Sequence, residues 1–393
     1  MSKPLILSDP SAFSQALFEL LTQLNTGIAE LELYEFRYAL DNLTPAEGWV
    51  AVQVKKIELL EQQINQPTFF KSIELKPIQD KRIVLDAHIV RLNQQLFTGM
   101  VSGEYPLDWV REHFYFDIRA FSFFVRTQYF TPQIIERFGG QPLIQFSPRQ
   151  KELESLQDIG YPEFRQANRE IDRAFLDLML KLVGMNGAPL LLTIVGPSCA
   201  GKSEITARLQ EALRSAGHDA VAVEMDNFFK DRSYRDNQPM DTQVIHFDLF
   251  KKAITDLLQG RAAAIPRYDF VLATSSHDLE SSLRPGQTML EIRPADIILL
   301  EGNFPFHIPE IAPLIDIKVI YLTDDPARLK RKWRRDVDYR KKYDPAYLCN
   351  RYFKTQRLRA DEIYQPMLAV CDLAVDTTSA ALWAATEIAA IIG

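Results

Sequence analysis

Cysteine, glycine and long apolar runs are all scarce in this sequence. Three cysteines occur among 393 residues, and Cys199, Cys349 and Cys371 lie too far apart to form a metal-binding knuckle. Three cysteines cannot all pair with one another, which favours a reducing compartment. The 16 glycines and 22 prolines show no collagen-like or low-complexity pattern. No apolar run approaches the ~18 residues that a membrane-spanning helix requires, so we expect no membrane partner.

An excess of basic residues is absent as well. Lysine and arginine number 45 against 52 aspartates and glutamates, and the net charge is −7. This balance argues against binding to nucleic acid over the whole surface. Near the N-terminus, polar Ser8 and Asp9 follow before a signal-peptide core could form. We therefore expect a cytoplasmic protein without a nucleic-acid partner.

The chain divides into two unlike halves, and its length predicts two or three domains. We expect a mainly α-helical N-terminal domain of unknown role over residues 1–150. A linker with a connecting helix should follow over residues 151–188, where glycine and proline residues cluster at its start. An α/β domain is expected over residues 189–393.

Helical periodicity dominates the first of these segments. The aromatic-rich stretch from residue 109 to 129 has no accompanying pattern of carboxylates or histidines, so we interpret it as packed core. Helices are expected to start after Pro10 and around residues 28–40, 48–64, 82–96 and 162–183.

From residue 189 the pattern changes to short apolar runs that alternate with helical segments. Continuous apolar strands separated by helices are typical of a parallel sheet covered on both faces. The expected strands are 190–195, 220–225, 297–300, 317–322 and 373–375, and the expected helices between them include 202–216, 249–259 and 325–335.

The most specific motif is a glycine-rich loop that matches G-x-x-x-x-G-K-[ST]. It stands between an apolar strand and a helix, where its glycines let backbone N–H groups face phosphate oxygens. Lys202 is expected to reach the β- and γ-phosphates, and Ser203 to ligate Mg²⁺. We interpret Cys199 as filling a permissive loop position rather than as a redox sensor. The predicted nucleotide-binding residues are Gly196, Ser198, Cys199, Ala200, Gly201, Lys202, Ser203 and Glu204.

Two carboxylates follow predicted strands of the same sheet. Asp226 comes after the strand that ends near Met225, and Glu301 comes after Leu300. Chemistry in an open parallel sheet gathers at the carboxyl ends of its strands. A carboxylate beside a phosphate-binding loop can hold Mg²⁺ or accept a proton from an attacking hydroxyl. We therefore predict that Asp226 and Glu301 belong to the active site.

A basic run follows the strand that ends at Leu322. It extends from Arg328 to Arg335 and continues with Arg340, Lys341 and Lys342. Such a run is often only a solvated helix face. Its place at the phosphate edge of the sheet favours a lid whose arginines neutralise charge during phosphoryl transfer.

The order of these motifs resembles the uridine kinase and phosphoribulokinase family. The resemblance covers about residues 190–376 and rests on the glycine-rich loop, Asp226-Asn-Phe-Phe-Lys230, Pro266-Arg-Tyr-Asp-Phe270, Leu300-Glu-Gly302 and the segment Asp325–Asp336. It implies a P-loop NTPase fold and a kinase that moves the γ-phosphate of ATP to a primary hydroxyl of a sugar or nucleoside.

The resemblance also implies roles for single residues. Asp226 matches the family's base and metal-site aspartate, and Glu301 its second acidic Mg²⁺ ligand. Lys202, Asp226 and Arg335 are thereby the expected catalytic residues, with Ser203, Asp226 and Glu301 around the metal. Expected substrate contacts are Asp241, in a register one residue uncertain, Tyr268, Arg335 and Arg340.

The sequence departs from the family where a nucleobase would bind. Met240 stands in place of a stacking aromatic residue, and the histidine expected soon after Phe270 is missing, with His277 arriving late. Lys332 and Lys342 stand where nucleoside kinases usually carry arginine, which gives up bidentate geometry.

We therefore expect an ATP- and Mg²⁺-dependent kinase of a small-molecule hydroxyl acceptor. The acceptor could be a nucleoside (uridine- or cytidine-like) or a sugar, or alternatively a sugar phosphate or small hydroxy acid. A nucleotide-dependent switch or assembly ATPase, with the helical half as effector, is a further alternative. For the helical half, support of the lid or formation of a homo-oligomer is the simplest interpretation.

Overall fold

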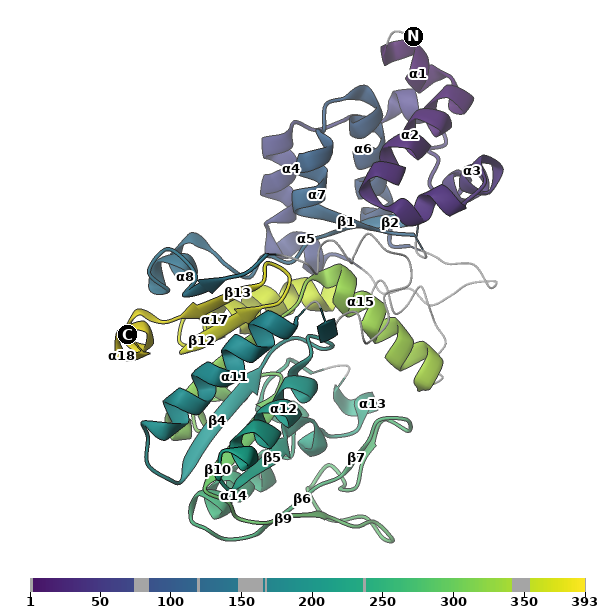
Figure 1. Cartoon of the computed structure of the whole chain (residues 1–393). Coiled ribbons are helices and arrows are strands. Elements are labelled where there is room, and N and C mark those ends of the chain that lie inside the picture. The colour runs from purple at the N-terminus through teal and green to yellow at the C-terminus, as the bar shows by residue number, and fades with distance from the viewer. Residues whose placement is uncertain are drawn as a thin grey trace.

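The computed structural model describes residues 3–73, 85–118, 121–147, 165–166, 168–235, 238–340 and 354–392 (Figure 1). The predicted start of the connecting helix near residue 162, the lysines at 341 and 342 and Cys349 lie outside these ranges. Within the described ranges, every helix is too short or too polar to cross a membrane.

The first part of the chain is a group of short helices that ends in a β-hairpin. Helix α2 begins directly after its N-cap residue Asp9, whose carboxylate accepts hydrogen bonds from the backbone N–H groups of Ser11 and Ala12. Apolar residues at helical spacing on α2 face the core of this part, which also contains the hairpin. The elements are α1 (Lys3–Ser8), α2 (Pro10–Leu24), η1 (Thr26–Glu30), α3 (Leu33–Asp41), η2 (Trp49–Ala51), α4 (Ile57–Ile64), α5 (Pro67–Lys71), α6 (Ala87–Ser102), α7 (Leu107–His113), β1 (Phe114–Asp117) and β2 (Ser122–Val125).

Two helices in this part are shorter than the sequence predicts. The expected helix 28–40 is divided between η1 and α3, because Leu31 and Glu32 are extended and Glu32 forms a capping box with Glu35. Of the expected helix 48–64, only η2 and α4 are helical. The aromatic stretch is packed core, as predicted, but its buried rings lie on the hairpin β1–β2 rather than on a helix.

A seven-stranded sheet forms the centre of the second part. Its order is β3-β13-β12-β11-β4-β10-β5, with parallel pairing from β12 to β5 and antiparallel pairing of β13 with β12 and β3. The strands are β3 (Ile144–Gln145), β4 (Leu190–Val195), β5 (Ala220–Glu224), β10 (Ile297–Gly302), β11 (Ile317–Leu322), β12 (Leu373–Asp376) and β13 (Ala381–Ala384). All five predicted strands are present, and the fold is the expected α/β P-loop NTPase fold.

Helices cover both faces of this sheet (Figure 1). One face packs against α11 and α12, and the other against α8, α14 and α17. The remaining elements are α8 (Pro132–Arg137), α11 (Arg169–Gly184), α12 (Lys202–Ser215), η3 (Met225–Phe228), α13 (Arg232–Arg235), η4 (Thr242–Val244), α14 (Phe247–Leu258), β6 (Ala263–Ile265), β7 (Tyr268–Asp269), β8 (Thr274–Ser275), β9 (Leu290–Ile292), η5 (Pro305–His307), η6 (Ala312–Leu314), α15 (Asp325–Trp333), the π-helices η7 (Arg334–Tyr339) and η8 (Ala360–Tyr364), α17 (Gln365–Leu368) and α18 (Thr386–Ile392).

The two parts meet along helix α15. Leu329, on α15, is buried in the core of the N-terminal part. Arg126 pairs with Asp324 at the start of α15, and the backbone N–H of Thr127 donates to Asp325. Residues before position 150 also contact the central sheet, where β3 pairs with β13. The division at residues 150 and 188 stays a prediction.

Candidate active site

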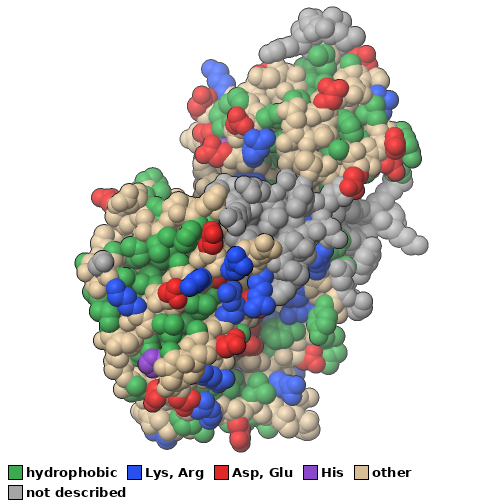
Figure 2. Space-filling view, in the orientation of Figure 1, with side chains coloured by type: hydrophobic (Ala, Val, Ile, Leu, Met, Phe, Trp, Pro, Cys, Tyr) green, Lys and Arg blue, Asp and Glu red, His purple; other side chains and the backbone are tan. Residues whose placement is uncertain are grey.

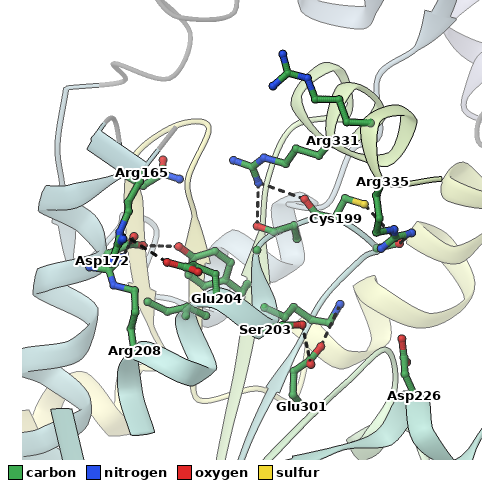
Figure 3. A pocket seen from close by; sticks show the side chains of 18 of the residues that line it. Arg165, Asp172, Cys199, Ser203, Glu204, Arg208, Asp226, Glu301, Arg331 and Arg335 are labelled. Carbon is green, nitrogen blue, oxygen red and sulfur yellow. Dashed lines mark hydrogen bonds and ion pairs between the residues drawn. The ribbon is translucent and has the colours of Figure 1, made fainter. Parts of the chain in front are cut away.

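The glycine-rich loop connects β4 to α12 and curls tightly against β11. A Cβ atom at Gly196 would lie 2.1 Å from the backbone oxygen of Tyr321, so no side chain fits there. Gly201 has a φ of +106° directly before α12, a conformation that favours glycine. Cys199 also has a positive φ, +65°. Each predicted nucleotide-binding residue from Ser198 to Glu204 lines one cavity of about 640 Å³ (Figure 3).

Lys202, Ser203 and Glu301 form a contact group in the lining of this cavity, and Figure 3 shows Ser203 pointing toward Glu301. The Oγ of Ser203 donates to Glu301 Oε2 at 2.9 Å, and Lys202 Nζ lies 3.6 Å from Glu301 Oε1. Burial raises the pKa of Glu301, although Lys202 and the Ser203 hydrogen bond oppose this shift. Among the described residues, Lys202 Nζ also lies 3.4 Å from the backbone oxygen of Pro197.

Asp226 lies in η3, next to the end of β10. The Nδ2 of Asn303 donates to Asp226 Oδ1 at 2.9 Å. Sequence reasoning did not select Asn303, although its place directly after Leu300-Glu301-Gly302 could have indicated it. Both side chains line the nucleotide cavity and a second, neighbouring cavity.

The basic run of α15 and η7 lies against the phosphate-binding loop. Arg335 donates from Nη2 to Ser198 Oγ at 3.2 Å, and Arg331, which was not among the predicted site residues, donates to the Cys199 oxygen at 3.2 Å. Asp336 pairs with Lys332, Arg335 and Arg340. Burial acts to raise the pKa of its carboxyl, but Lys332 and Arg335 lower it further than burial raises it. The expected lid arginines, Arg335 and Arg340, are therefore held together by Asp336, and both line a second cavity beside the first.

The second cavity, of about 130 Å³, contains several of the predicted substrate contacts. Tyr268 is buried at its edge, and its hydroxyl accepts a 2.7 Å hydrogen bond from Arg235. Arg340 lies with its guanidinium 4.8 Å from the centre of the Phe270 ring. Two carboxylates, Asp226 and Asp336, line this cavity. Six cationic side chains also line it: Arg232, Arg235, Lys332, Arg335, Arg340 and Arg359. Lysine and arginine side chains gather near the middle of the molecule in the space-filling view (Figure 2).

Two predicted site residues, Gly196 and Asp241, line neither cavity. Asp241 lies in a different part of the fold from the loop. Its carboxylate caps η4 by accepting a hydrogen bond from the N–H of Gln243 at 2.7 Å. The neighbouring Met240 does line the second cavity. A substrate role for Asp241 stays a prediction.

The predicted metal residues supply few protein ligands. Within the described ranges, no three His, Cys, Asp or Glu side chains gather in a way that could hold a metal ion. Two carboxylates, Asp226 and Glu301, and the Ser203 hydroxyl still fit Mg²⁺, which usually takes one or two carboxylates and completes its shell with water and substrate phosphates.

Comparison with known proteins identifies the domain that carries this site. Residues 191–380 match the model of the Phosphoribulokinase / Uridine kinase family. The C-terminal half is similar to this family. The resemblance predicted from the motifs is thereby confirmed, and the similarity supports a P-loop phosphotransferase.

Several relatives of this kinase domain carry related names. A uridine kinase of Leuconostoc citreum is 29% identical over 161 residues, which are 39% of this chain and 70% of that protein. Uridine-cytidine kinase A of Dictyostelium discoideum is 32% identical over 154 residues, 38% of this chain and 28% of that protein. A solved structure of a possible uridine kinase from Bacillus stearothermophilus is 22% identical, with a TM-score of 0.36 over 51% of this chain and 97% of that one.

Proposed function

We propose that the protein is an ATP- and Mg²⁺-dependent kinase that phosphorylates a hydroxyl group of a small molecule. The observation that carries this proposal is the junction of two cavities. Ser198, Asp226, Asn303 and Arg335 line both the cavity around the phosphate-binding loop and the basic cavity beside it. A γ-phosphate bound by the loop and a hydroxyl in the second cavity would meet at these residues.

The candidate residues divide the chemistry of transfer among them. Asp226 would accept the hydroxyl proton while the acceptor oxygen bonds to the γ-phosphorus and the bond to the bridging oxygen of ADP breaks. Lys202 would neutralise charge on the β- and γ-phosphates, and Arg335 would do so from the lid. Ser203, Asp226 and Glu301 would hold Mg²⁺. When bound, the metal supplies positive charge that stabilises the transferring group.

The charge of the second cavity bears on the acceptor class. Six cations against two carboxylates favour an acceptor that carries its own anionic group, such as a sugar phosphate or a hydroxy acid. The replacement of an aromatic residue by Met240 points the same way, since the side chain at this position has no ring to stack on a base. A nucleoside remains the second candidate, because the relatives are named uridine and uridine-cytidine kinases.

For the N-terminal part we propose a supporting role for the lid. One side of α15 carries Arg331 toward the phosphate-binding loop, while Leu329 lies in the N-terminal core. A further contact joins the two parts, because Lys354 Nζ donates to the backbone oxygen of Ile73 at 2.6 Å. These contacts would hold the lid helix in a fixed position over the phosphates.

An acceptor screen tests the proposed function. Purified protein would be mixed with ATP, Mg²⁺ and single candidates from nucleosides, sugars, sugar phosphates and hydroxy acids, and ADP release would be measured. Stimulation by an anionic acceptor that is absent in Lys202→Ala supports the proposal, and stimulation by uridine or cytidine favours the second candidate. Slow ADP release that no acceptor changes would contradict it and favour a nucleotide-dependent switch.

A further inference from the structure

Asn303 lies between the two cavities without a role in the predicted site. Its side chain is 9% exposed, it lines both cavities, and its Nδ2 donates to Asp226. We propose that Asn303 is a positioning residue for phosphoryl transfer, which holds the Asp226 carboxylate in the orientation that accepts the hydroxyl proton. This inference rests on the proposed kinase function of the same site.

The backbone fixes Asn303 beside Asp226. A Cβ atom at Gly302 would lie 2.6 Å from the Cβ of Met225 and 2.9 Å from its sulfur. Glycine at position 302 therefore lets the end of β10 pack directly on η3. Asn303 follows Gly302 and Asp226 follows Met225, so this close packing sets the distance between the two polar side chains.

The hydrogen bond leaves one carboxylate oxygen for chemistry. Asp226 Oδ1 accepts from Asn303, whereas Oδ2 receives no hydrogen bond in the part of the chain that the structure describes. A donor on one oxygen restricts rotation of the carboxylate. Oδ2 then remains the acceptor for a substrate proton, and a base held in place contributes more to transfer than one that rotates freely.

The second polar atom of the Asn303 side chain lacks a hydrogen-bond partner among the described residues. This atom is Oδ1, and it is buried. Buried polar atoms are nearly always paired in folded proteins, so a donor that enters with the substrates would complete this group. A hydroxyl or a water molecule in the acceptor cavity has that chemistry. The carboxamide of Asn303 is also neutral, whereas an aspartate at this position would add a negative charge beside Asp226 and Glu301.

Kinetics of Asn303→Leu in two backgrounds test the proposal. The substitution keeps the approximate size of the side chain and removes the donor without adding a charge. We expect kcat to fall about 100-fold with the KM for ATP changed less than about threefold. In an Asp226→Asn background, measured in single turnovers, the same substitution should change the rate less than about threefold, because the group it positions is gone. Equal factors in both backgrounds, or an effect on KM alone, would overturn the proposal.

A binding measurement separates this inference from the proposed function. Binding of Mn²⁺ to the ADP complex can be followed by electron paramagnetic resonance without any acceptor. Asn303→Leu should weaken this binding about fivefold in the natural background and leave it unchanged with Asp226→Asn, since a loosely held Asp226 is a poorer ligand. No weakening in the natural background overturns the role of Asn303, even if the acceptor screen finds no substrate.

A second amide serves as the matched control. Gln95, in α6, has a buried Oε1 without a hydrogen-bond partner among the described residues, and it lies in the N-terminal part. Gln95→Leu should leave kcat and Mn²⁺ binding unchanged. A loss as large as that of Asn303→Leu would show a general effect of removing an amide and would count against positioning.

Discussion

The nucleotide end and the acceptor end of the candidate site are built in different ways. The nucleotide end centres on one short loop with the strand ends beside it, and Ser198 to Ile205 form the longest consecutive run in its lining. The acceptor end draws its lining from positions between 198 and 359, on η3, α13, β7, η7 and the segment before η8. Under the proposed function, phosphate binding would depend mainly on a local motif, while acceptor choice would depend on distant segments that meet in the fold.

The largest effect should come from the nucleotide end. Lys202→Ala removes the buried cation that faces Glu301 and the phosphate site. We expect kcat to fall by about 10³-fold or more with every acceptor, because the charge on the transferring group is no longer neutralised. Steady-state rates with two chemically different acceptors would check this. A loss confined to one acceptor would contradict the separation of the two ends.

At the acceptor end, a substitution should change the affinity for one substrate class. Arg235 donates to the Tyr268 hydroxyl, and its guanidinium lies 4.2 Å from the centre of the Phe229 ring. For Arg235→Ala we expect the KM for an anionic acceptor to rise about 10- to 100-fold, as for loss of a charged hydrogen bond, with the KM for ATP unchanged. Initial rates over both substrates measure this.

Two further variants sharpen the test of Arg235. Arg235→Lys keeps the charge but loses the planar fork, so it should recover only part of the affinity. Arg261, whose guanidinium pairs with Asp256 on α14, is a control outside both cavities, and Arg261→Ala should change neither KM. An unchanged KM for the acceptor in Arg235→Ala would remove the argument for an anionic acceptor.

The two ends also differ in how far they could be predicted from the sequence. The loop was predictable because its glycines, Lys202 and Ser203 are consecutive, and β4 and α12 carry clear apolar patterns. Asp226 and Glu301 were predictable from their places after apolar strands. Arg235 and Arg359 were not, because only the packing of α13 and η8 around Asp226 brings them to one cavity.

The same reason applies to the fold. The five parallel strands are buried on both faces and read as continuous apolar runs. The edge strand β13 and its partner β3 are short, and β3 comes from more than 200 residues earlier in the chain, so no local pattern indicates their pairing. Likewise, the apolar spacing does not indicate the capping box of Glu32 and Glu35, which starts α3 and separates it from η1.

A smaller effect is expected where the N-terminal part meets the lid. Leu329 is 1% exposed and lies in the N-terminal core, with no contact to a substrate cavity. Leu329→Ala should lower the free energy of unfolding by about 2–5 kcal/mol. It should also lower kcat about five- to tenfold, because α15 carries Arg331 and leads directly into Arg335.

An equally buried leucine in the same core controls for destabilisation alone. Leu17, on α2, is fully buried and distant in sequence from α15. Leu17→Ala should lower the melting temperature by a similar amount while kcat, measured well below that temperature, stays unchanged. If both variants lose activity equally, the N-terminal part does not act through the lid.

The smallest expected effect concerns a buried histidine near the acceptor end. The His246 ring lies between the hydroxyls of Ser275 and Ser281, each 3.0 Å away. Burial, with His277 and Lys230 nearby, lowers the pKa of His246 to about 4, against the opposing effect of Asp231 and Asp278. The unfolded chain therefore binds a proton at this residue between about pH 6.5 and 4, where the folded chain does not.

Stability from this neutral histidine is fully present above about pH 6.5 and is lost as the pH falls toward 4. We expect the melting temperature to drop by a few degrees over that range, beyond the drop in His246→Gln, since glutamine can keep hydrogen bonds to both serines without titrating. Thermal unfolding at about pH 7.0, 6.0, 5.0 and 4.5, which spans the titration, gives both curves. Parallel curves would mean that His246 stays uncharged in the unfolded chain as well or is charged in both states. A steeper curve for the natural protein would assign this part of the acid sensitivity to His246, whereas the described lining of the cavity around the phosphate-binding loop contains no histidine.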